Sequence, residues 1–111
     1  MNNILHLYDL MKKNLEIVNG IKEMDENKFL NHNECLNYSY GLINEIRKDF
    51  MKLNKEILIS NEVISKISKE MYILDERLLN SYKGINGYLV YDFLKVEYDL
   101  ILDELTKMIN I

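Results

Sequence analysis

His32 and Cys35 are the residues whose types and spacing come nearest to a chemical site. They stand three positions apart in a segment expected to be helical, a spacing at which an imidazole and a thiolate can reach one metal ion. A zinc site needs further ligands, and His6 is the only other histidine, so carboxylates would have to complete the set. The simpler interpretation is a buried Cys35 beside a solvent-facing His32.

The sequence does not indicate the other groups that catalysis by these residues would require. A cysteine nucleophile needs a positioned base and a pocket, and the sequence indicates neither. Glu-x-x-His pairs, glycine-rich phosphate loops and serine-centred elbows are absent. We therefore expect no catalytic residue, no metal and no cofactor. The alternative that stays open is a metal-binding or enzymatic helical bundle using His6, His32 and Cys35.

The elements that must position these side chains are predicted to be helices. Proline is absent and only four of the 111 residues are glycine, so little interrupts a helix or builds the tight turns of a β-protein. Hydrophobic residues make up 48% and charged residues 29%, which is the balance of a folded protein. The sequence thus predicts an all-α fold with one domain, residues 1–111.

Apolar residues recur at spacings of three and four in four segments. The segments span about residues 3–23, 26–58, 61–81 and 88–109. Asp25 or Asn27 and then Ser60-Asn61 are predicted to cap the second and third helices, and the long second helix is expected to kink near Gly41 or Asn54. The loop at 83–87 contains two glycines. We expect a small antiparallel bundle of about four helices.

Charge and hydropathy restrict the partners. The net charge is −4, and residues 56–111 carry six basic against ten acidic side chains, so a nucleic-acid backbone is an unfavourable partner. No apolar run is long enough to cross a bilayer, and the first residues lack a secretory signal, so we expect no membrane partner and a cytoplasmic location. The abundance of Asn, Ile and Lys suggests a low-GC bacterial source.

The last segment, residues 88–109, has two apolar faces on a wheel of about 100° per residue. The broad face includes Val90, Leu94, Tyr98, Ile101 and Leu105, and the second face comprises Leu89, Phe93, Val96 and Leu100. We expect the second face to bind a partner protein or a twin subunit, so that truncation of Phe93 spares the fold. A helix covered on both sides by its own chain is the alternative, and tyrosines on this helix suit either reading.

Two parts of the chain resemble families of small helical proteins. The stretch from Leu78 to Tyr82 and from Tyr88 to Leu100 resembles a family of small uncharacterised helical proteins of low-GC Gram-positive bacteria. The opening helices, with a polar break at 24–30 followed by Leu42-Ile43-Asn44-Glu45-Ile46, are similar to FliT-type flagellar export chaperones. The second resemblance implies a small bundle that holds a partner's segment against an apolar groove.

The sequence therefore predicts a non-enzymatic protein-interaction module, either chaperone-like or a regulatory adaptor. Its partner is another protein or a second copy of the chain, bound through Leu89, Phe93, Val96 and Leu100. A homodimer is included in this expectation.

Overall fold

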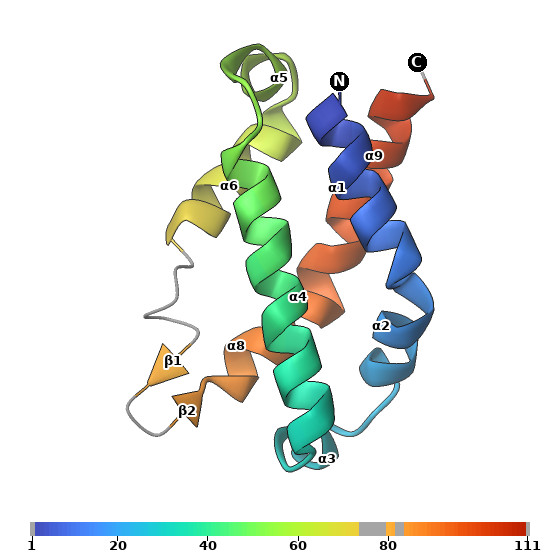
Figure 1. Ribbon diagram of the computed structural model, residues 1–111, viewed down its shortest axis with the longest axis vertical. Helices are drawn as coiled ribbons and strands as arrows, with labels where there is room; N and C mark the ends of the chain where they lie inside the picture. Colours follow the sequence, from blue (N-terminus) through green and yellow to red (C-terminus); the bar gives the residue numbers. More distant parts are fainter. Residues whose placement is uncertain (1, 74–79, 82–83, 111) are drawn as a thin grey trace.

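The computed structural model describes residues 2–73, 80–81 and 84–110 (Figure 1). Its helices are α1 (Asn2–Lys13), α2 (Leu15–Lys22), α3 (Glu26–Leu30), α4 (Asn33–Met51), α5 (Lys55–Ser60), α6 (Glu62–Ile73), α8 (Gly87–Asp92), the π-helix η1 (Phe93–Glu97) and α9 (Tyr98–Ile109). Two short strands, β1 (Asn80–Ser81) and β2 (Gly84–Ile85), pair antiparallel, with Asn80 opposite Ile85. The predicted all-α class is confirmed.

The predicted helices are divided more finely than their apolar spacing indicates. The first breaks at Asn14, whose side chain amide donates to the Leu10 carbonyl at 2.8 Å and accepts from the Tyr38 hydroxyl. The second is divided into α3, α4 and α5, with no break at Gly41. The described residues therefore contain more helices than the four predicted.

Asparagine side chains begin three of these helices. The side chains of Asn54, Asn61 and Asn86 accept hydrogen bonds from the backbone amides of Ile57, Ile64 and Leu89, which satisfies an amide in the first turn. The kink predicted near Gly41 or Asn54 is instead a break between α4 and α5 that ends at Asn54. The cap predicted at Ser60-Asn61 is formed by Asn61.

The loop glycine Gly84 has a φ of +122°, a backbone conformation that favours glycine.

Leu74 and Leu78, the last apolar residues of the predicted third helix, lie outside the described residues.

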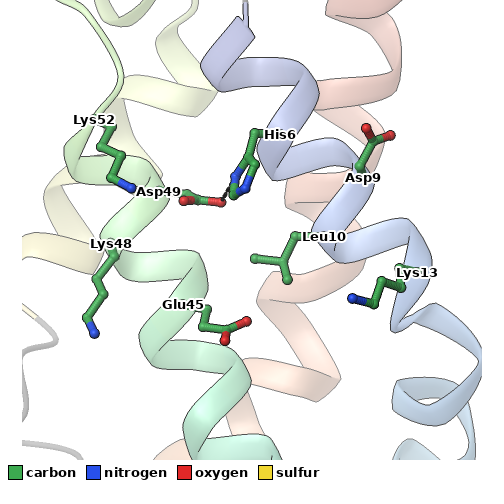
Figure 2. A pocket seen from close by; sticks show the side chains of 8 residues that line it. All are labelled: His6, Asp9, Leu10, Lys13, Glu45, Lys48, Asp49 and Lys52. Carbon is green, nitrogen blue, oxygen red and sulfur yellow. Dashed lines mark hydrogen bonds and ion pairs between the residues drawn. The ribbon is translucent and has the colours of Figure 1, made fainter.

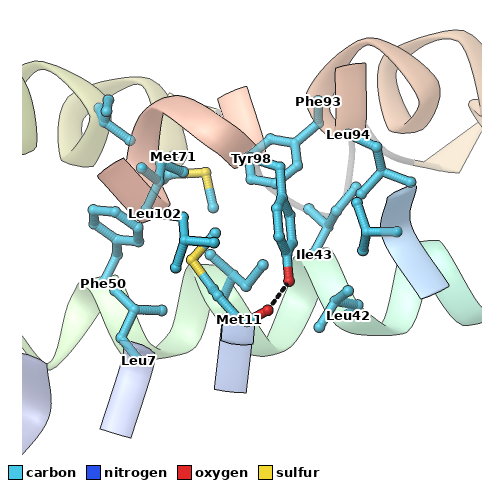
Figure 3. Close-up of a cluster of buried hydrophobic side chains, with 14 of the residues drawn as sticks. Leu7, Met11, Leu42, Ile43, Phe50, Met71, Phe93, Leu94, Tyr98 and Leu102 are labelled. Atoms are coloured by element: carbon cyan, nitrogen blue, oxygen red, sulfur yellow. Dashed lines mark hydrogen bonds between the residues drawn. The ribbon is translucent and has the colours of Figure 1, made fainter. Parts of the chain in front are cut away.

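The core lies where α1, α4 and α9 meet, and α6 packs against both α4 and α9. Figure 1 shows α4 crossing in front of the C-terminal helices, with α1 beside α9. Figure 3 shows the cluster around the buried ring of Tyr98. Ile4, Leu7 and Met11 form the buried stripe of α1, as their spacing predicts. Within the described ranges, no helix is both long and apolar enough to span a bilayer.

Candidate functional site

The C-terminal helical segment contains a π-turn in its middle. Residues Phe93–Glu97 form η1, between α8 and α9. Each residue of a π-helix turns the chain by less than the 100° of an α-helix, so residues before η1 are rotated relative to those after it. This rotation brings the Phe93 ring toward the side that carries Leu94 and Tyr98. Phe93 is only 4% exposed and belongs to the core.

The placement of Phe93 corrects the predicted partner surface. Phe93 was expected to meet a partner, but the chain's own core covers it. Leu89 is half-buried against the same core. Val96 and Leu100 remain at the surface, with 64% and 45% of their area exposed. The four residues of the predicted second face are therefore divided between the interior and the surface.

We use the term outer face of α9 for the solvent-exposed residues of α9 together with the last exposed residue of η1. These residues are Val96 of η1 and Asp99, Leu100, Asp103 and Lys107 of α9. Val96 and Leu100 are one helical turn apart, with carboxylates on either side of Leu100 along the chain. Asp99 forms an ion pair with Lys22 of α2. The outer face is thus an apolar pair with a mainly acidic surround.

Two tyrosines of the C-terminal segment form hydrogen bonds to the backbone of the N-terminal part of the chain. The Tyr91 hydroxyl donates to the Met24 carbonyl at 2.6 Å, and the Tyr98 hydroxyl donates to the Met11 carbonyl at 2.5 Å. Burial raises the pKa of Tyr98 above its ordinary value. Tyr88, by contrast, is exposed. Tyr91 and Tyr98 are therefore structural residues, although the sequence left them equally suited to an interface.

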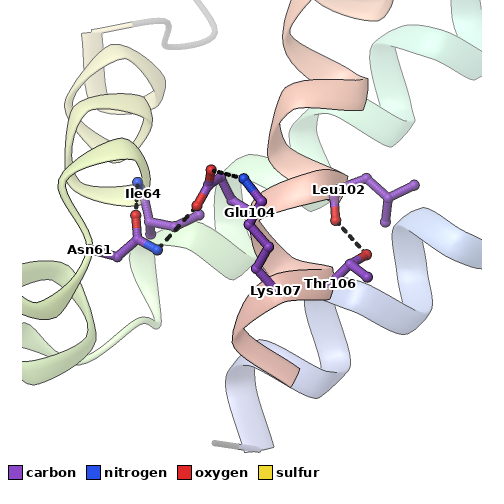
Figure 4. A network of polar contacts seen from close by, with 6 residues as sticks. All are labelled: Asn61, Ile64, Leu102, Glu104, Thr106 and Lys107. Atoms are coloured by element: carbon purple, nitrogen blue, oxygen red, sulfur yellow. Dashed lines mark hydrogen bonds and ion pairs between the residues drawn. The ribbon is translucent and has the colours of Figure 1, made fainter. Parts of the chain in front are cut away.

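The carboxylates of Glu97 and Glu104 lie toward α6 and differ in their hydrogen-bond donors and neighbouring charges. The Glu104 carboxylate accepts from Asn61 Nδ2 and from Lys107 Nζ, each at 3.3 Å (Figure 4). The pKa of Glu97 is raised, first by burial and then by the nearby charge of Glu70, while Lys66 acts in the opposite sense. The charged form of Glu97 is therefore disfavoured in the folded state.

We predict that Glu97→Gln stabilises the protein at pH 7. The pKa of Glu97 is higher in the folded state than in the unfolded state. The free energy of unfolding therefore falls as the pH rises from the unfolded-state pKa through the folded-state pKa and Glu97 ionises. Solvent screening limits the gain to a few tenths of a kcal/mol, or about 1–4 °C in melting temperature. The gain should vanish below the ordinary glutamate pKa of about 4.3. Thermal unfolding from pH 4 to 7 measures it.

Glu104→Gln is the matched control, because its carboxylate already has two donors. It should not stabilise the protein at pH 7. Equal stabilisation by both variants would mean that the acidic net charge, rather than the surroundings of Glu97, is responsible.

His6, His32 and Cys35 are not brought together. His6 lies on α1 with its Nδ1 atom 2.7 Å from the Asp49 carboxylate of α4. His32 is exposed and caps α4 by accepting from the Cys35 amide at 3.2 Å, while Cys35 is a half-buried free thiol. Among the described residues, no group of three histidine, cysteine or carboxylate side chains is placed to hold a metal ion.

The His6–Asp49 pair borders a groove of about 570 Å³ between α1 and α4 (Figure 2). The groove is lined by His6, Asp9, Leu10, Lys13, Glu45, Lys48, Asp49 and Lys52. Asp49 is nearly buried and orients the exposed imidazole, as a carboxylate does in a catalytic pair. No hydroxyl or thiol side chain is among these lining residues, whose polar groups are imidazole, ammonium and carboxylate. Sequence spacing gave no signal for this pair, because 43 positions separate its members.

Comparison with known proteins adds no assignment: no family model, no curated protein and no solved structure matches the chain. The two family resemblances drawn from the sequence stay predictions.

Proposed function

We propose that this protein is a non-enzymatic interaction module that binds a partner protein through the outer face of α9. The observation that carries the proposal is the exposure of Val96 and Leu100, one turn apart, on a helical segment whose opposite side supplies core residues. A neighbouring pair of exposed aliphatic side chains offers apolar area that a partner can cover. Leu89 is half-buried and Phe93 is interior, so the surface is centred on Val96 and Leu100.

The surround of the apolar pair favours a partner with basic side chains. Asp99 and Asp103 are exposed next to Leu100, and the whole chain carries a net charge of −4. Such a surface attracts cationic groups and repels phosphate backbones, so a protein is favoured over a nucleic acid. A role as a chaperone-like or regulatory adaptor, which the resemblance to export chaperones implies, uses the same kind of contact.

The scaffold that we propose for this surface is an antiparallel bundle. Tyr98 bonds to Met11 and Tyr91 bonds to Met24, so the C-terminal segment runs opposite to the N-terminal one along their contact. These bonds fix the segment at Tyr91 and at Tyr98. A fixed helix presents its exposed side chains without the ordering cost that a flexible segment incurs on binding.

The test compares capture of binding proteins by Val96→Asp, Leu100→Asp and the unaltered protein from an extract of the source cell. Each substitution should reduce a specifically captured protein by at least about fivefold, because loss of an apolar anchor costs more than about 1 kcal/mol. Ile59→Asp is the matched control, since Ile59 is an exposed aliphatic residue on α5. Quantitative mass spectrometry of the captured proteins provides the measurement.

Capture that is unchanged by both substitutions in α9 would contradict the proposal. The alternative function, a metal-binding or enzymatic bundle using His6, His32 and Cys35, would be favoured by stoichiometric zinc or iron in the purified protein.

A further inference from the structure

We propose that the groove between α1 and α4 is a binding site for a small molecule that carries a phosphate group. The side chains that hold the phosphate are His6 and Lys13 of α1 and Lys48 and Lys52 of α4. None of these residues belongs to the outer face of α9. The site is therefore separate from the proposed partner surface, and the two proposals can fail independently.

Three lysines line the groove, from both of its helices. In the described ranges of the chain, no carboxylate lies within ion-pair distance of the ammonium groups of Lys13, Lys48 and Lys52. Lys48 and Lys52 are one turn apart on α4, and Lys13 lies across the groove on α1. Lysine carries its charge on a flexible stem, so ammonium groups from two helices can turn toward one bound anion.

The charges along the groove favour an anion, although the whole chain has a net charge of −4. When His6 is protonated, four cationic side chains share the groove with the carboxylates of Asp9, Glu45 and Asp49. Asp49 is nearly buried and bonded to His6, and in Figure 2 the Asp9 carboxylate points away from α4. Charges farther away than about 8 Å are largely screened at physiological salt, so these neighbours outweigh the net charge.

The His6–Asp49 pair couples anion binding to proton uptake. The Asp49 carboxylate only accepts hydrogen bonds, so the proton between Asp49 and His6, 2.7 Å apart, belongs to Nδ1 of the imidazole. A neutral imidazole then presents Nε2 as an acceptor, whereas an imidazolium donates through both nitrogens. The His6 side chain is 69% exposed, which leaves Nε2 accessible. A bound anion therefore selects the protonated form of His6.

The open end of the groove lies where α1 begins and α4 ends. A smaller hollow of about 260 Å³ is lined by Asn3 together with His6, Asp49 and Lys52. Carbonyl groups at the end of a helix repel an anion, but Asn3 Nδ2 donates to the Lys52 carbonyl at 2.7 Å. The positive N-terminal end of α1 lies beside the same turn and offsets the opposite end of α4. The side-chain charges therefore decide which ligand binds.

Sulfate is the probe for this site, because it is a tetrahedral dianion whose charge stays constant while histidine titrates. Nuclear magnetic resonance titration at constant ionic strength should show saturable shifts around His6, with a dissociation constant of about 1–10 mM near pH 6. Near pH 8, binding should be about tenfold weaker, because histidines generally lose their charge between about pH 5 and 8. The charged groups that face the imidazole along the groove are Asp9, Lys13, Glu45, Lys48, Asp49 and Lys52.

Substitutions on α4 test which side chains hold the anion. Lys48→Gln and Lys52→Gln should each weaken sulfate binding about threefold to fivefold. Glu45→Gln, which removes a competing carboxylate, should strengthen it about threefold. Lys12→Gln is the matched control, because Lys12 is an exposed lysine of α1 that does not line the groove. It should change the dissociation constant by less than about twofold.

His6→Gln tests the proton coupling. This variant should bind sulfate equally near pH 6 and near pH 8, because glutamine does not titrate. Circular dichroism verifies its fold, since the nearly buried Asp49 loses its partner. If His6→Gln does not fold, the pH dependence of the unaltered protein and the lysine variants still decide the proposal.

Three results would overturn the proposal. The first is no saturable shift up to about 50 mM sulfate near pH 6. The second is unchanged binding by the double variant Lys48→Gln/Lys52→Gln. The third is acetate binding as tightly as sulfate, which would assign the groove to carboxylates rather than to phosphate groups. Saturable sulfate binding that weakens at higher pH and with both lysine substitutions supports the proposal.

Discussion

Phe93→Ala should lower the free energy of unfolding by about 3–5 kcal/mol, because truncation of a buried phenylalanine removes apolar contacts and leaves a cavity. Phe93 is 4% exposed and belongs to the core cluster, beside the π-turn that directs it inward. For a domain of this size, the melting temperature should fall by at least about 12 °C. This result is the opposite of the one expected from an α-helical wheel, on which Phe93 faces a partner.

Val96→Ala is the matched control for this prediction. It truncates an aliphatic residue of the same π-turn, but Val96 is 64% exposed, so stability should change by no more than about 0.5 kcal/mol. Urea unfolding followed by circular dichroism measures both variants. A small effect of Phe93→Ala would contradict the inward placement of this ring.

Tyr98→Ala should have a comparable effect, a loss of about 3–5 kcal/mol. The ring of Tyr98 is fully buried, and its hydroxyl donates to the Met11 carbonyl at 2.5 Å near the break between α1 and α2 (Figure 3). The substitution removes both the packing and the donor. Tyr98→Phe separates the two contributions, because it keeps the ring and removes only the hydroxyl. Loss of this buried hydrogen bond should cost about 1–3 kcal/mol.

The pH dependence of Tyr98 gives a second readout for the same residue. Because burial raises the pKa of Tyr98, its hydroxyl should stay protonated in the folded protein when exposed tyrosines ionise. The folded state is then favoured below the unfolded tyrosine pKa of about 10, and stability falls as pH rises above that value. Spectrophotometric titration should show one fewer late-ionising tyrosine in Tyr98→Phe. Identical titration curves, or equal stability of Tyr98→Phe and the unaltered protein, would contradict the role of this hydroxyl.

Local signals predicted much of the fold. The spacing of Ile4, Leu7 and Met11 identified the inner side of the first helix, and all three are buried. Asn61 was identified as a helix cap because a short polar side chain can bond to an amide of the first turn, and it does so. Asn54 was predicted, with Gly41, only as a place for a kink in a long helix, and its side chain caps a new helix there. Signals of this kind depend on residues a few positions apart, which is why one sequence is sufficient to read them.

The candidate surface was predicted only in part, because the π-turn changes the angle between successive residues. A wheel with a constant 100° per residue places Phe93 with Val96 and Leu100, whereas the structure places Phe93 inside and the other two outside. No residue type in the segment indicates that turn. With this turn in place, Phe93, Leu94 and Tyr98 are all buried.

Contacts between distant segments were also beyond sequence reasoning. His6 was considered with His32 and Cys35 because these residue types share metal chemistry, yet its partner in the structure is Asp49. The break at Asn14 likewise involves a contact between distant segments, the hydrogen bond that the Tyr38 hydroxyl donates to Asn14. Helix propensity is weak enough for such contacts to override it.

The central claim is that one helical segment divides its apolar residues between the core, at Phe93, and a partner surface, at Val96 and Leu100. The most direct test measures melting temperature and partner binding together for Phe93→Ala and Leu100→Asp. We predict that Phe93→Ala lowers the melting temperature strongly, while Leu100→Asp keeps it nearly unchanged and loses binding, since its side chain is 45% exposed. A Leu100→Asp variant that melts normally and retains all binding would contradict the claim.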